Sequence, residues 1–419
     1  MRGRVWWRIA WRNLWRNRRR TLITASALAF GFLGAVVMIG ISDGFTSEMV
    51  ENGTGLLTGQ VHVHAQGYRR ERSLYETIGG PGGTDVATLL ADADDLPGVA
   101  GAAPRVYGGG IVSAGDATEA ALLLGVDPAR EARVSRVLGS LVRGRAPRSG
   151  ARELAIGEEM ARRLRAMPGT EVVVVAPAAD GSTGNDLFTV SGIFRTGLGD
   201  LDAAFAVLPI DALQGLLALD STRVHEIAIR TTDVRQDAAV AARLARRLAP
   251  LRLGVEVVPW TVFSPEIADY VKLAEASNGL IVAIVFLFAI FGVANTILMG
   301  TFERRREFAV VRALGTVPAG VAATVLWEGL ALGLLSLAAG AVLTAPVLVW
   351  LHHSPIDLTA IAGDMEFAGA LVRPVLRVEY SVSGPVESAV GLLVTGLLAA
   401  LYPAIRAARV PPADALAGR

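Results

Sequence analysis

Two histidines separated by one residue are the first candidates for chemistry in this sequence. His62 and His64 lie in an alternating stretch, residues 59–66, which is typical of a β-strand, so both side chains would project from one face. Two imidazoles on one face form a candidate metal pair, but a zinc site generally takes three or four protein ligands. A solvated strand face explains the pair equally well. His352 and His353 are adjacent and share no face, and we predict no metal site.

The sequence lacks the other common signatures of an active site. No serine or paired-carboxylate motif has a recognisable catalytic spacing, and the chain contains no cysteine. No GxGxxG motif follows a predicted strand. A phosphate-binding GxxxxGK[ST] loop is ruled out because the one lysine, Lys272, follows Tyr270 and Val271. We therefore predict that the chain is not an enzyme, has no catalytic residues or cofactor of its own, and carries no Walker-type ATPase.

A short basic segment, residues 303–315, is the strongest candidate for binding a partner. Its periodicity predicts an amphipathic helix that ends at Gly315, with an apolar edge formed by Phe308, Val311 and Leu314. One interpretation is a basic loop that anchors two membrane segments, and the other is a docking helix for a cytoplasmic partner. The edge is flanked by Arg304, Arg305 and Arg312.

Glu328 is a second candidate. A carboxylate inside a membrane segment is a functional candidate by default. The apolar residues 329–350 could span alone, however, which would leave Glu328 at the cytoplasmic interface. Both interpretations stay open.

Long stretches without a charge must position these residues. A hydrocarbon core of about 30 Å takes about 20 helical residues. Residues 21–41, 277–302 and 329–350 can therefore each span a membrane on their own, and residues 388–405 do so once residues 381–386, on the other side of Glu387, are included. At 52% hydrophobic and 19% charged residues, the 419-residue chain is also more apolar than an ordinary soluble domain. We predict an integral membrane α-helical protein of four transmembrane helices, with a large mixed α/β extracytoplasmic domain between helices 1 and 2. The uncharged stretches are residues 21–41, 277–302, 329–350 and 388–405.

The distribution of arginine predicts the orientation. Eight arginines and no acid precede the first span, and further arginines follow the second and fourth spans. Because positive residues near span ends favour the cytoplasm, both termini should lie inside. The predicted parts are a cytoplasmic amphipathic helix (1–20), transmembrane helix 1 (21–41), the extracytoplasmic domain (42–276), transmembrane helix 2 (277–302), a cytoplasmic helix (303–318), transmembrane helix 3 (319–351), a short extracytoplasmic loop (352–385), transmembrane helix 4 (386–405) and a cytoplasmic tail (406–419).

The N-terminal segment has a helical pattern of its own. Trp7, Trp11 and Trp15 recur every four residues beside a stripe of arginines. This pattern is typical of a helix in the membrane interface, with indoles at the headgroups and arginines toward anionic lipid. A cleaved secretory signal is the alternative, but the apolar run is too long and the candidate cleavage site at residues 27–29 falls in its middle.

The insert between the first two spans contains both strand and helix patterns. Glycine- and proline-rich residues 79–83, 108–110 and 179–184 predict loops. Residues 264–278 predict a helical stalk that continues into the second span. Strands are expected at 59–66, 120–126, 171–176, 188–194, 224–230 and 255–259, and helices at 157–166, 209–218 and 234–248.

Motifs along nearly the whole chain resemble one family. Residues 10–21 (AWRNLWRNRRRT) and 304–315 (RRREFAVVRALG) are similar to the start of span one and to the coupling helix of FtsX/MacB-like ABC transporter permeases. Residues 328–335 (EGLALGLL) and 402–416 (YPAIRAARVPPADAL) resemble spans three and four of that superfamily. Three further motifs resemble the periplasmic domain of the Lol-type lipoprotein-releasing branch of that superfamily. They are GVDP at 125–128, AIGEEMARRL at 155–164 and FTVSGIFRTG at 188–197.

The resemblance implies a function and partners. It implies the permease subunit of a mechanotransmission (type VII) ABC transporter of the bacterial inner membrane, in which a separate ATPase dimer uses ATP–Mg to move the periplasmic domains of two permeases. Lipoprotein would be the substrate and a periplasmic carrier the recipient, with no role for nucleic acid. Export of another amphiphile (drug, peptide or lipid) and FtsX-like signalling to a cell-wall hydrolase are the alternatives. The implied ATPase-docking residues are Arg304, Arg305, Arg306, Glu307, Phe308, Arg312, Leu314 and Gly315.

Overall fold

The chain divides into two compact units. The computed structural model describes residues 2–68, 75–81, 83–251, 253–357, 361, 365–367, 370–372, 375–379 and 382–411. The first unit, here the helical unit, is drawn from Met1–Thr46, Val271–Ile361 and Val375–Arg419, and the second, here the insert domain, from Ser47–Tyr270 and Ala362–Pro374. Residue 381 of the predicted fourth-span extension and residues 412–416 of the last motif lie outside the described residues.

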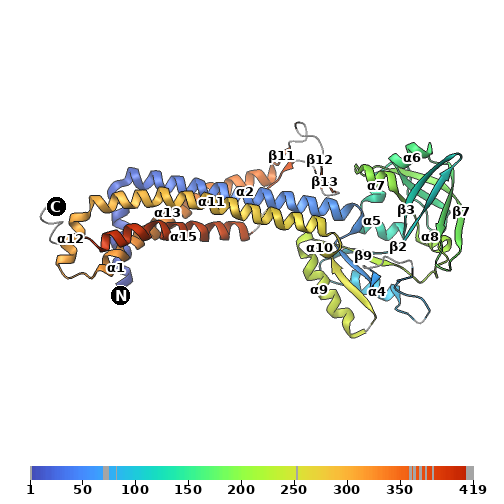
Figure 1. Cartoon of the computed structure of the whole chain (residues 1–419), viewed down its shortest axis with the longest axis horizontal. Helices are drawn as coiled ribbons and strands as arrows, with labels where there is room; N and C mark the ends of the chain where they lie inside the picture. Colours follow the sequence, from blue (N-terminus) through green and yellow to red (C-terminus); the bar gives the residue numbers. More distant parts are fainter. Residues whose placement is uncertain are drawn as a thin grey trace. The chain divides into compact units, whose positions relative to one another are not determined.

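Four helices in the described chain are long and apolar enough to cross a membrane (Figure 1). They are α2 (Arg18–Gly53), α11 (Pro265–Glu303), α13 (Pro318–His353) and α15 (Ser383–Ala408). At 1.5 Å per residue, α2 and α11 are each more than about 50 Å long, well beyond the hydrocarbon thickness of a bilayer. The predicted stalk is therefore helical and continuous with the second apolar stretch. Shorter helices α1 (Arg2–Leu14) and α12 (Arg305–Ala313) flank them.

Polar contacts join α2 and α11 near both ends of their apolar stretches. Arg20 donates to Glu303 across 3.2 Å, and Thr24 donates to Thr296 across 3.2 Å one turn further along. At the other end Asn278 donates a hydrogen bond to Ser42. Hydrogen bonds between helices hold apolar segments in register where water is scarce.

The closest helix contact in the helical unit lies between α13 and α15. A Cβ on Gly329 would sit 2.5 Å from the carbonyl oxygen of Gly396, and a Cβ on Gly396 would sit 2.8 Å from the carbonyl oxygen of Gly329. Only glycine permits this approach, as expected for small residues at membrane helix interfaces. Gly333, four residues further along α13, has ordinary contacts, with Leu393 at 3.5 Å.

A short segment after the third helix crosses α2. The backbone N–H of Glu379 donates to the carbonyl oxygen of Gly40, and a Cβ on Gly44 would collide with the carbonyl oxygen of Arg377 at 2.1 Å. Val378 between them is buried. Strand β11 (Ile356–Asp357) pairs with β14 (Val375–Leu376), and separately β12 (Met365–Phe367) pairs with β13 (Ala370–Val372).

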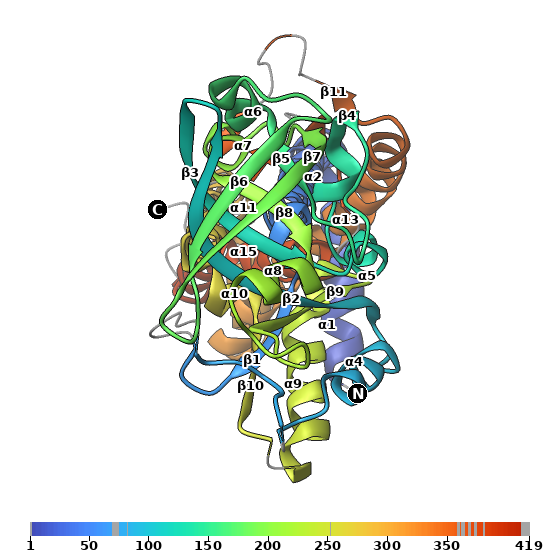
Figure 2. The same ribbon diagram turned by 90° about the vertical axis from the view of Figure 1, so that its right-hand side faces the viewer.

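A ten-stranded sheet forms the framework of the insert domain. Its order is β10-β1-β9-β2-β3-β8-β5-β7-β4, with β6 joined to both β2 and β7. The strands β2, β3, β8, β5, β7 and β6 thus close a ring (Figure 2), whose interior holds part of the main apolar core. The strands are β1 (Val61–Ala65), β2 (Val99–Ala114), β3 (Ala117–Val126), β4 (Leu141–Gly144), β5 (Glu153–Gly157), β6 (Glu171–Pro177), β7 (Thr183–Phe194), β8 (Phe205–Pro209), β9 (Glu226–Thr231) and β10 (Val255–Pro259).

Short helices connect these strands, which gives the predicted mixed α/β domain. Asp85 caps α4 and Asp127 caps α5 by accepting hydrogen bonds from the first turn, as N-cap residues do. In α9, Val240, Leu244 and Leu248 share a buried face. The helices are α4 (Val86–Asp94), α5 (Pro128–Val134), α6 (Glu158–Leu164), α7 (Gly199–Ala204), α8 (Ile210–Leu216), α9 (Asp237–Leu248) and α10 (Trp260–Phe263).

One predicted loop is wrong. Gly108, Gly109 and Gly110 lie inside β2, the longest strand, rather than in a joint between subdomains. A Cβ on Gly110 would sit 2.6 Å from the carbonyl oxygen of Val175 in β6, so glycine here permits close strand packing, not a turn. The predicted loops at 79–83 and 179–184 do contain turns, although β7 begins at Thr183.

Candidate functional site

The predicted amphipathic helix at 303–315 exists as α12, but it is shorter than expected and separate from α11. Arg304 has non-helical dihedral angles and divides the two helices. At the other end Gly315 has φ +96°, and its N–H bonds to the carbonyl of Arg312, which is the left-handed helix stop that glycine favours. Pro318 then starts α13.

The predicted apolar edge of α12 is divided between two surroundings. Phe308 is buried among apolar side chains of the helical unit. Val310 and Val311 are exposed, and Leu314 is 82% exposed. A helix of nine residues therefore anchors through one aromatic ring and presents other apolar side chains outward.

The predicted arginines of α12 have different roles. Arg304 donates to Glu328 across 2.7 Å and lies 4.9 Å from the centre of the Phe308 ring, a cation–π contact. Arg312 donates to the carbonyl oxygens of Ala408 and Val410 at 3.2 and 2.6 Å, beside the end of α15. These two arginines attach α12 to the helical unit. Arg305 and Arg306 are exposed.

Glu328 has partners from two other segments. Its Oε1 accepts from Asn13 at 2.5 Å and from Arg304 at 2.7 Å, and its side chain is 13% exposed. Both partners belong to the polar segments that flank the apolar stretches. Of the two interpretations, the geometry therefore favours a carboxylate at the end of the span over an isolated one within it.

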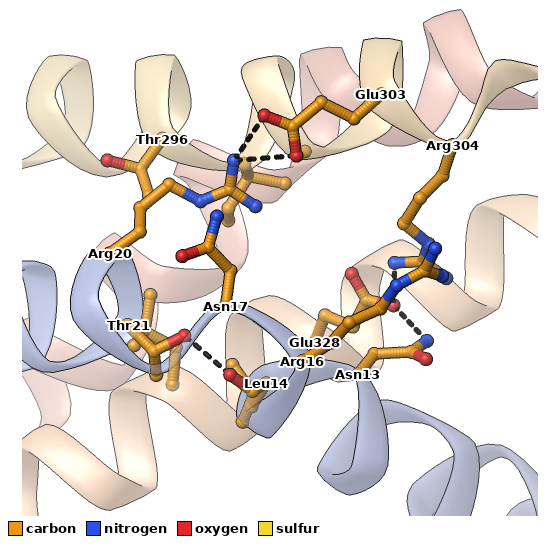
Figure 3. A pocket seen from close by; sticks show the side chains of 13 residues that line it. Asn13, Leu14, Arg16, Asn17, Arg20, Thr21, Thr296, Glu303, Arg304 and Glu328 are labelled. Atoms are coloured by element: carbon orange, nitrogen blue, oxygen red, sulfur yellow. Dashed lines mark hydrogen bonds and ion pairs between the residues drawn. The ribbon is translucent and has the colours of Figure 1, made fainter.

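These residues border a cavity of about 210 Å³ (Figure 3). Arg20 and Glu303 close one side of it, while Glu328, Asn13 and Arg304 close the other. We call α12 together with this cavity the α12 site. The cavity is polar and its charges are compensated, so it can hold water but offers no excess charge for an ion. Further lining comes from Leu14, Arg16, Asn17, Thr21, Thr296, Ile297, Gly300 and Leu332.

The histidine pair lies in the insert domain and is fully buried, so the solvated strand face is wrong. β1 runs between β9 and β10, which removes His62 and His64 from solvent. His62 Nδ1 faces Glu226 at 3.1 Å, and His64 Nδ1 faces Glu256 at 3.1 Å. Within the described ranges, no group of three or more histidine, aspartate or glutamate residues is arranged to hold a metal.

The carboxylate beside His62 belongs to a buried ionic cluster. Arg105 donates to Glu131 at 2.6 Å and lies 3.5 Å from Glu226, with all three side chains fully buried. Burial alone would raise the pKa of Glu226, but attraction to His62 and Arg105 outweighs it and holds the pKa to about 2. Burial lowers the pKa of His64. This cluster joins β1, β2, α5 and β9.

Comparison with known proteins identifies the family. Residues 21–247 match the MacB-like periplasmic core domain, and residues 279–412 match the FtsX-like permease C-terminal domain. The first match alone covers more than half of the chain. The chain belongs to the MacB/FtsX-like permease family. The predicted family is therefore confirmed, and with it a membrane permease with a MacB-like domain between its first two apolar helices.

The relatives of this permease include lipoprotein-releasing proteins. The lipoprotein-releasing system transmembrane protein LolC of Xylella fastidiosa (strain Temecula1 / ATCC 700964) is 26% identical over 344 residues, covering 79% of this chain and 80% of its own. LolC of Neisseria meningitidis serogroup B is 24% identical over 409 residues, covering 94% and 93%. The periplasmic region of MacB from Actinobacillus actinomycetemcomitans covers 52% of this chain and 97% of that chain at 14% identity and a TM-score of 0.36, too weak a likeness to bear on function.

One part of this permease's α12 site was missed by sequence reasoning. Arg16 and Arg20 do not face lipid alone: Arg16 pairs with Glu307 at 2.6 Å and Arg20 with Glu303 at 3.2 Å. The signal was present in the spacing. The two arginines are four residues apart and so are the two glutamates, a spacing that places side chains on one face of a continuous helix; in the structure Glu303 ends α11 and Glu307 lies in α12. The indoles also pack internally, with Trp7 edge-on to Trp327 at 6.0 Å.

Proposed function

We propose that this chain is the membrane subunit of an ABC transporter that releases lipoproteins from the bacterial inner membrane. Its family and the names of its LolC relatives support this assignment. The observation that carries the mechanism is α12, a helix attached on one side and apolar on the other. We assign the exposed side of α12 as the docking surface for a separate ATPase subunit, which would bind the ATP–Mg.

The chemistry of α12 supports docking. Leu314, Val310 and Val311 form an exposed apolar patch beside Arg305 and Arg306. An amphipathic helix of this kind fits into an apolar groove with an acidic rim, a common mode of helix recognition. Because Arg304 and Arg312 bind α12 to α13 and to the end of α15, a displacement of α12 would be passed to those helices.

The long helices support transmission to the insert domain. α11 continues without a break from Pro265 through its apolar stretch to Glu303. A continuous helix is stiff, whereas a flexible linker transmits no displacement. In the proposed orientation both termini and α12 are cytoplasmic and the insert domain is periplasmic. A second permease, identical or related, would complete the transporter, and a periplasmic carrier would take the released lipoprotein.

Docking is tested by charge reversal on the exposed face of α12. The double substitution Arg306→Glu and Leu314→Asp should abolish copurification of the chain with its ATPase subunit, identified by its Walker motifs. The helical unit should keep its thermal midpoint, because both side chains are exposed and neither forms an ion pair or hydrogen bond among the described residues. Reversal of Arg163, which is exposed on α6 of the insert domain, is the matched control and should leave the complex intact. Full ATPase binding by the double variant would refute this docking surface.

Transmission and substrate are tested together in proteoliposomes. A Gly-Ser insertion after Ala274 interrupts α11, and we expect it to preserve ATP hydrolysis while abolishing release of a triacylated lipoprotein to added carrier protein. Unimpaired release would exclude transmission through α11. Release of a fluorescent phospholipid or drug, but of no lipoprotein, by the intact chain would instead favour export of another amphiphile.

Orientation is tested by labelling single cysteines in this cysteine-free chain. Ser182→Cys in the insert domain and Val317→Cys beside α12 are both at accessible positions. An impermeant thiol reagent should label only Ser182→Cys in intact spheroplasts. Labelling of Val317→Cys alone would invert the orientation.

A further inference from the structure

The insert domain has a hollow of about 670 Å³ whose lining is rich in arginine. We call it the arginine hollow. It lies beside α6 and α7, which are neighbours in Figures 1 and 2, and is independent of the α12 site. Four arginine side chains line it. One comes from β4, one from α6, one from the residue that ends α6, and one from the residue after β7. They belong to Arg143, Arg162, Arg165 and Arg195.

The acids in the hollow do not neutralise all four arginines. Glu158 accepts two hydrogen bonds from Arg195, one of them at 2.7 Å, and Glu159 pairs with Arg162. The third acid is the buried Asp202, which accepts from the N–H and hydroxyl of Thr196 and is satisfied within its own turn.

The lining therefore carries one positive charge in excess, with four arginines against three acids. In the part of the chain that the structure describes, neither Arg143 nor Arg165 has a carboxylate within ion-pair distance.

The backbone of Arg165 gives a second, independent observation. Arg165 ends α6 in the left-handed region, with φ +53°, and the N–H of Ala166 bonds back to the carbonyl of Ala161 at 2.9 Å. This helix ending normally carries glycine, because a Cβ is unfavourable there. Among the described residues, thirteen glycines have positive φ, and the one other exception is Ala218. The turn itself therefore does not explain an arginine at this position.

We propose that the arginine hollow binds a phosphate group carried on a small organic or lipid molecule. Guanidinium groups from separate elements offer N–H donors that match the oxygens of a phosphate. The excess positive charge of the lining suits its negative charge, and Arg143 and Arg165 have no carboxylate of the described chain within ion-pair distance to compete for it. Met167, 58% exposed at the rim, provides an apolar contact for the alkyl part of a phosphate ester. The ligand is either a free phosphate ester or the headgroup of an anionic phospholipid.

Binding is measured on the full-length chain in a nonionic detergent. Titration with sn-glycerol 3-phosphate in a calorimeter should give saturable binding, and sodium acetate should give none. Arg143→Gln and Arg165→Gly should each weaken binding by about tenfold or more, as loss of a charge-assisted hydrogen bond does. Arg163→Gln is the matched control, since Arg163 lies on the same helix but is not among the residues that line the hollow, and its partner Glu159 keeps its ion pair with Arg162.

A stability measurement separates binding from folding. Arg165→Gly should raise the thermal midpoint while weakening binding, because glycine relieves the left-handed backbone and removes the guanidinium. Loss of binding in this variant therefore cannot come from misfolding.

A lipid arm distinguishes the two sources. In nanodiscs of mixed phosphatidylglycerol and phosphatidylcholine, native mass spectrometry should show less retained phosphatidylglycerol in the Arg143→Gln, Arg165→Gly double variant if the ligand is a headgroup. Equal lipid retention with a weakened response to glycerol 3-phosphate identifies a free phosphate ester. Absence of saturable glycerol 3-phosphate binding together with equal lipid retention overturns the proposal, as does an equal loss in Arg163→Gln.

Discussion

Arg304 donates a 2.7 Å hydrogen bond to Glu328, and this contact joins the residue before α12 to the first part of α13. Both side chains are mostly shielded from solvent, at 14% and 13% exposure. Glu328 also holds Asn13 of α1, so a single carboxylate connects three segments of the helical unit. A charge in such a position is stable when both partners are present and unfavourable when one is removed.

The losses from removing the two partners should therefore not add. Glu328→Ala leaves Arg304 with only the more exposed Glu307, 3.4 Å away, and we expect it to lower the free energy of unfolding by about 1–3 kcal/mol. The double variant Glu328→Ala, Arg304→Ala should lose less than the sum of the single variants. Thermal unfolding in detergent of the unsubstituted chain, the two single variants and the double variant measures the coupling energy between Glu328 and Arg304. Additive losses would mean that the contact contributes nothing.

The close approach of α13 and α15 predicts a sharp difference between two neighbouring glycines. Gly329→Ala places a Cβ against the backbone of α15, and overpacking of this kind destabilises by about 1–3 kcal/mol. Gly333→Ala, one turn along the same helix, meets ordinary contacts and should be neutral or slightly stabilising, since alanine favours helix. The comparison is made by thermal unfolding in detergent. Equal effects at both positions would contradict the observed helix crossing.

The buried histidine and carboxylate of the insert domain predict acid sensitivity. Burial holds the folded pKa of His64 below its ordinary value of 6.5, so the unfolded chain binds this proton more readily, and stability should fall as the pH drops below 6.5. Glu226 acts in the same direction at lower pH: its stabilisation is complete above about 4.5 and is lost as the pH falls toward its folded pKa of about 2. The charged groups facing His64 are Glu256, Glu226 and His62.

Hydrogen exchange of the β1 and β9 amides, corrected for intrinsic rates, measures this effect. Protection should decrease from pH 7 to pH 5 in the native sequence, and His64→Gln should flatten that decrease. His353→Gln changes an exposed histidine of α13 and should leave it unaltered. A pH-independent protection in the native sequence would show that His64 does not titrate with unfolding.

Patterns local in sequence predicted the helices of this permease well. Absence of charge over residues 277–302 is sufficient to identify the apolar part of α11, because a bilayer imposes one simple requirement on length. A local pattern also predicted α12, because the spacing of its apolar residues and the glycine that ends it lie within a dozen residues. Local pattern did not show which face of α12 is buried, because that depends on where the ends of α13 and α15 lie.

The missed features depend on contacts between distant residues. β2 has few of the β-branched and aromatic residues typical of strands. Its glycines allow β6 to approach closely, but in the sequence a run of glycines is typical of a loop. The cluster of Arg105, Glu131 and Glu226 spans 121 positions of the chain, and none of the three has a local signal of burial. The matching spacing of Arg16 with Arg20 and of Glu303 with Glu307 is present in the sequence. It can be recognised only by comparing two segments that lie 283 positions apart along the chain.

The polar contacts at the two ends of the α2–α11 pair have a consequence for the lipid around it. From Arg20 to Ser42 and from Asn278 to Glu303 the helices rise by about 33 and 38 Å, slightly more than the roughly 30 Å of an average hydrocarbon core. Such an excess is accommodated by tilt or by local thickening of the bilayer. Because both ends are joined, neither helix can tilt alone without separating Arg20 from Glu303 or Ser42 from Asn278. Acyl-chain length sets the thickness of the bilayer, so a change of acyl-chain length reorients both helices together.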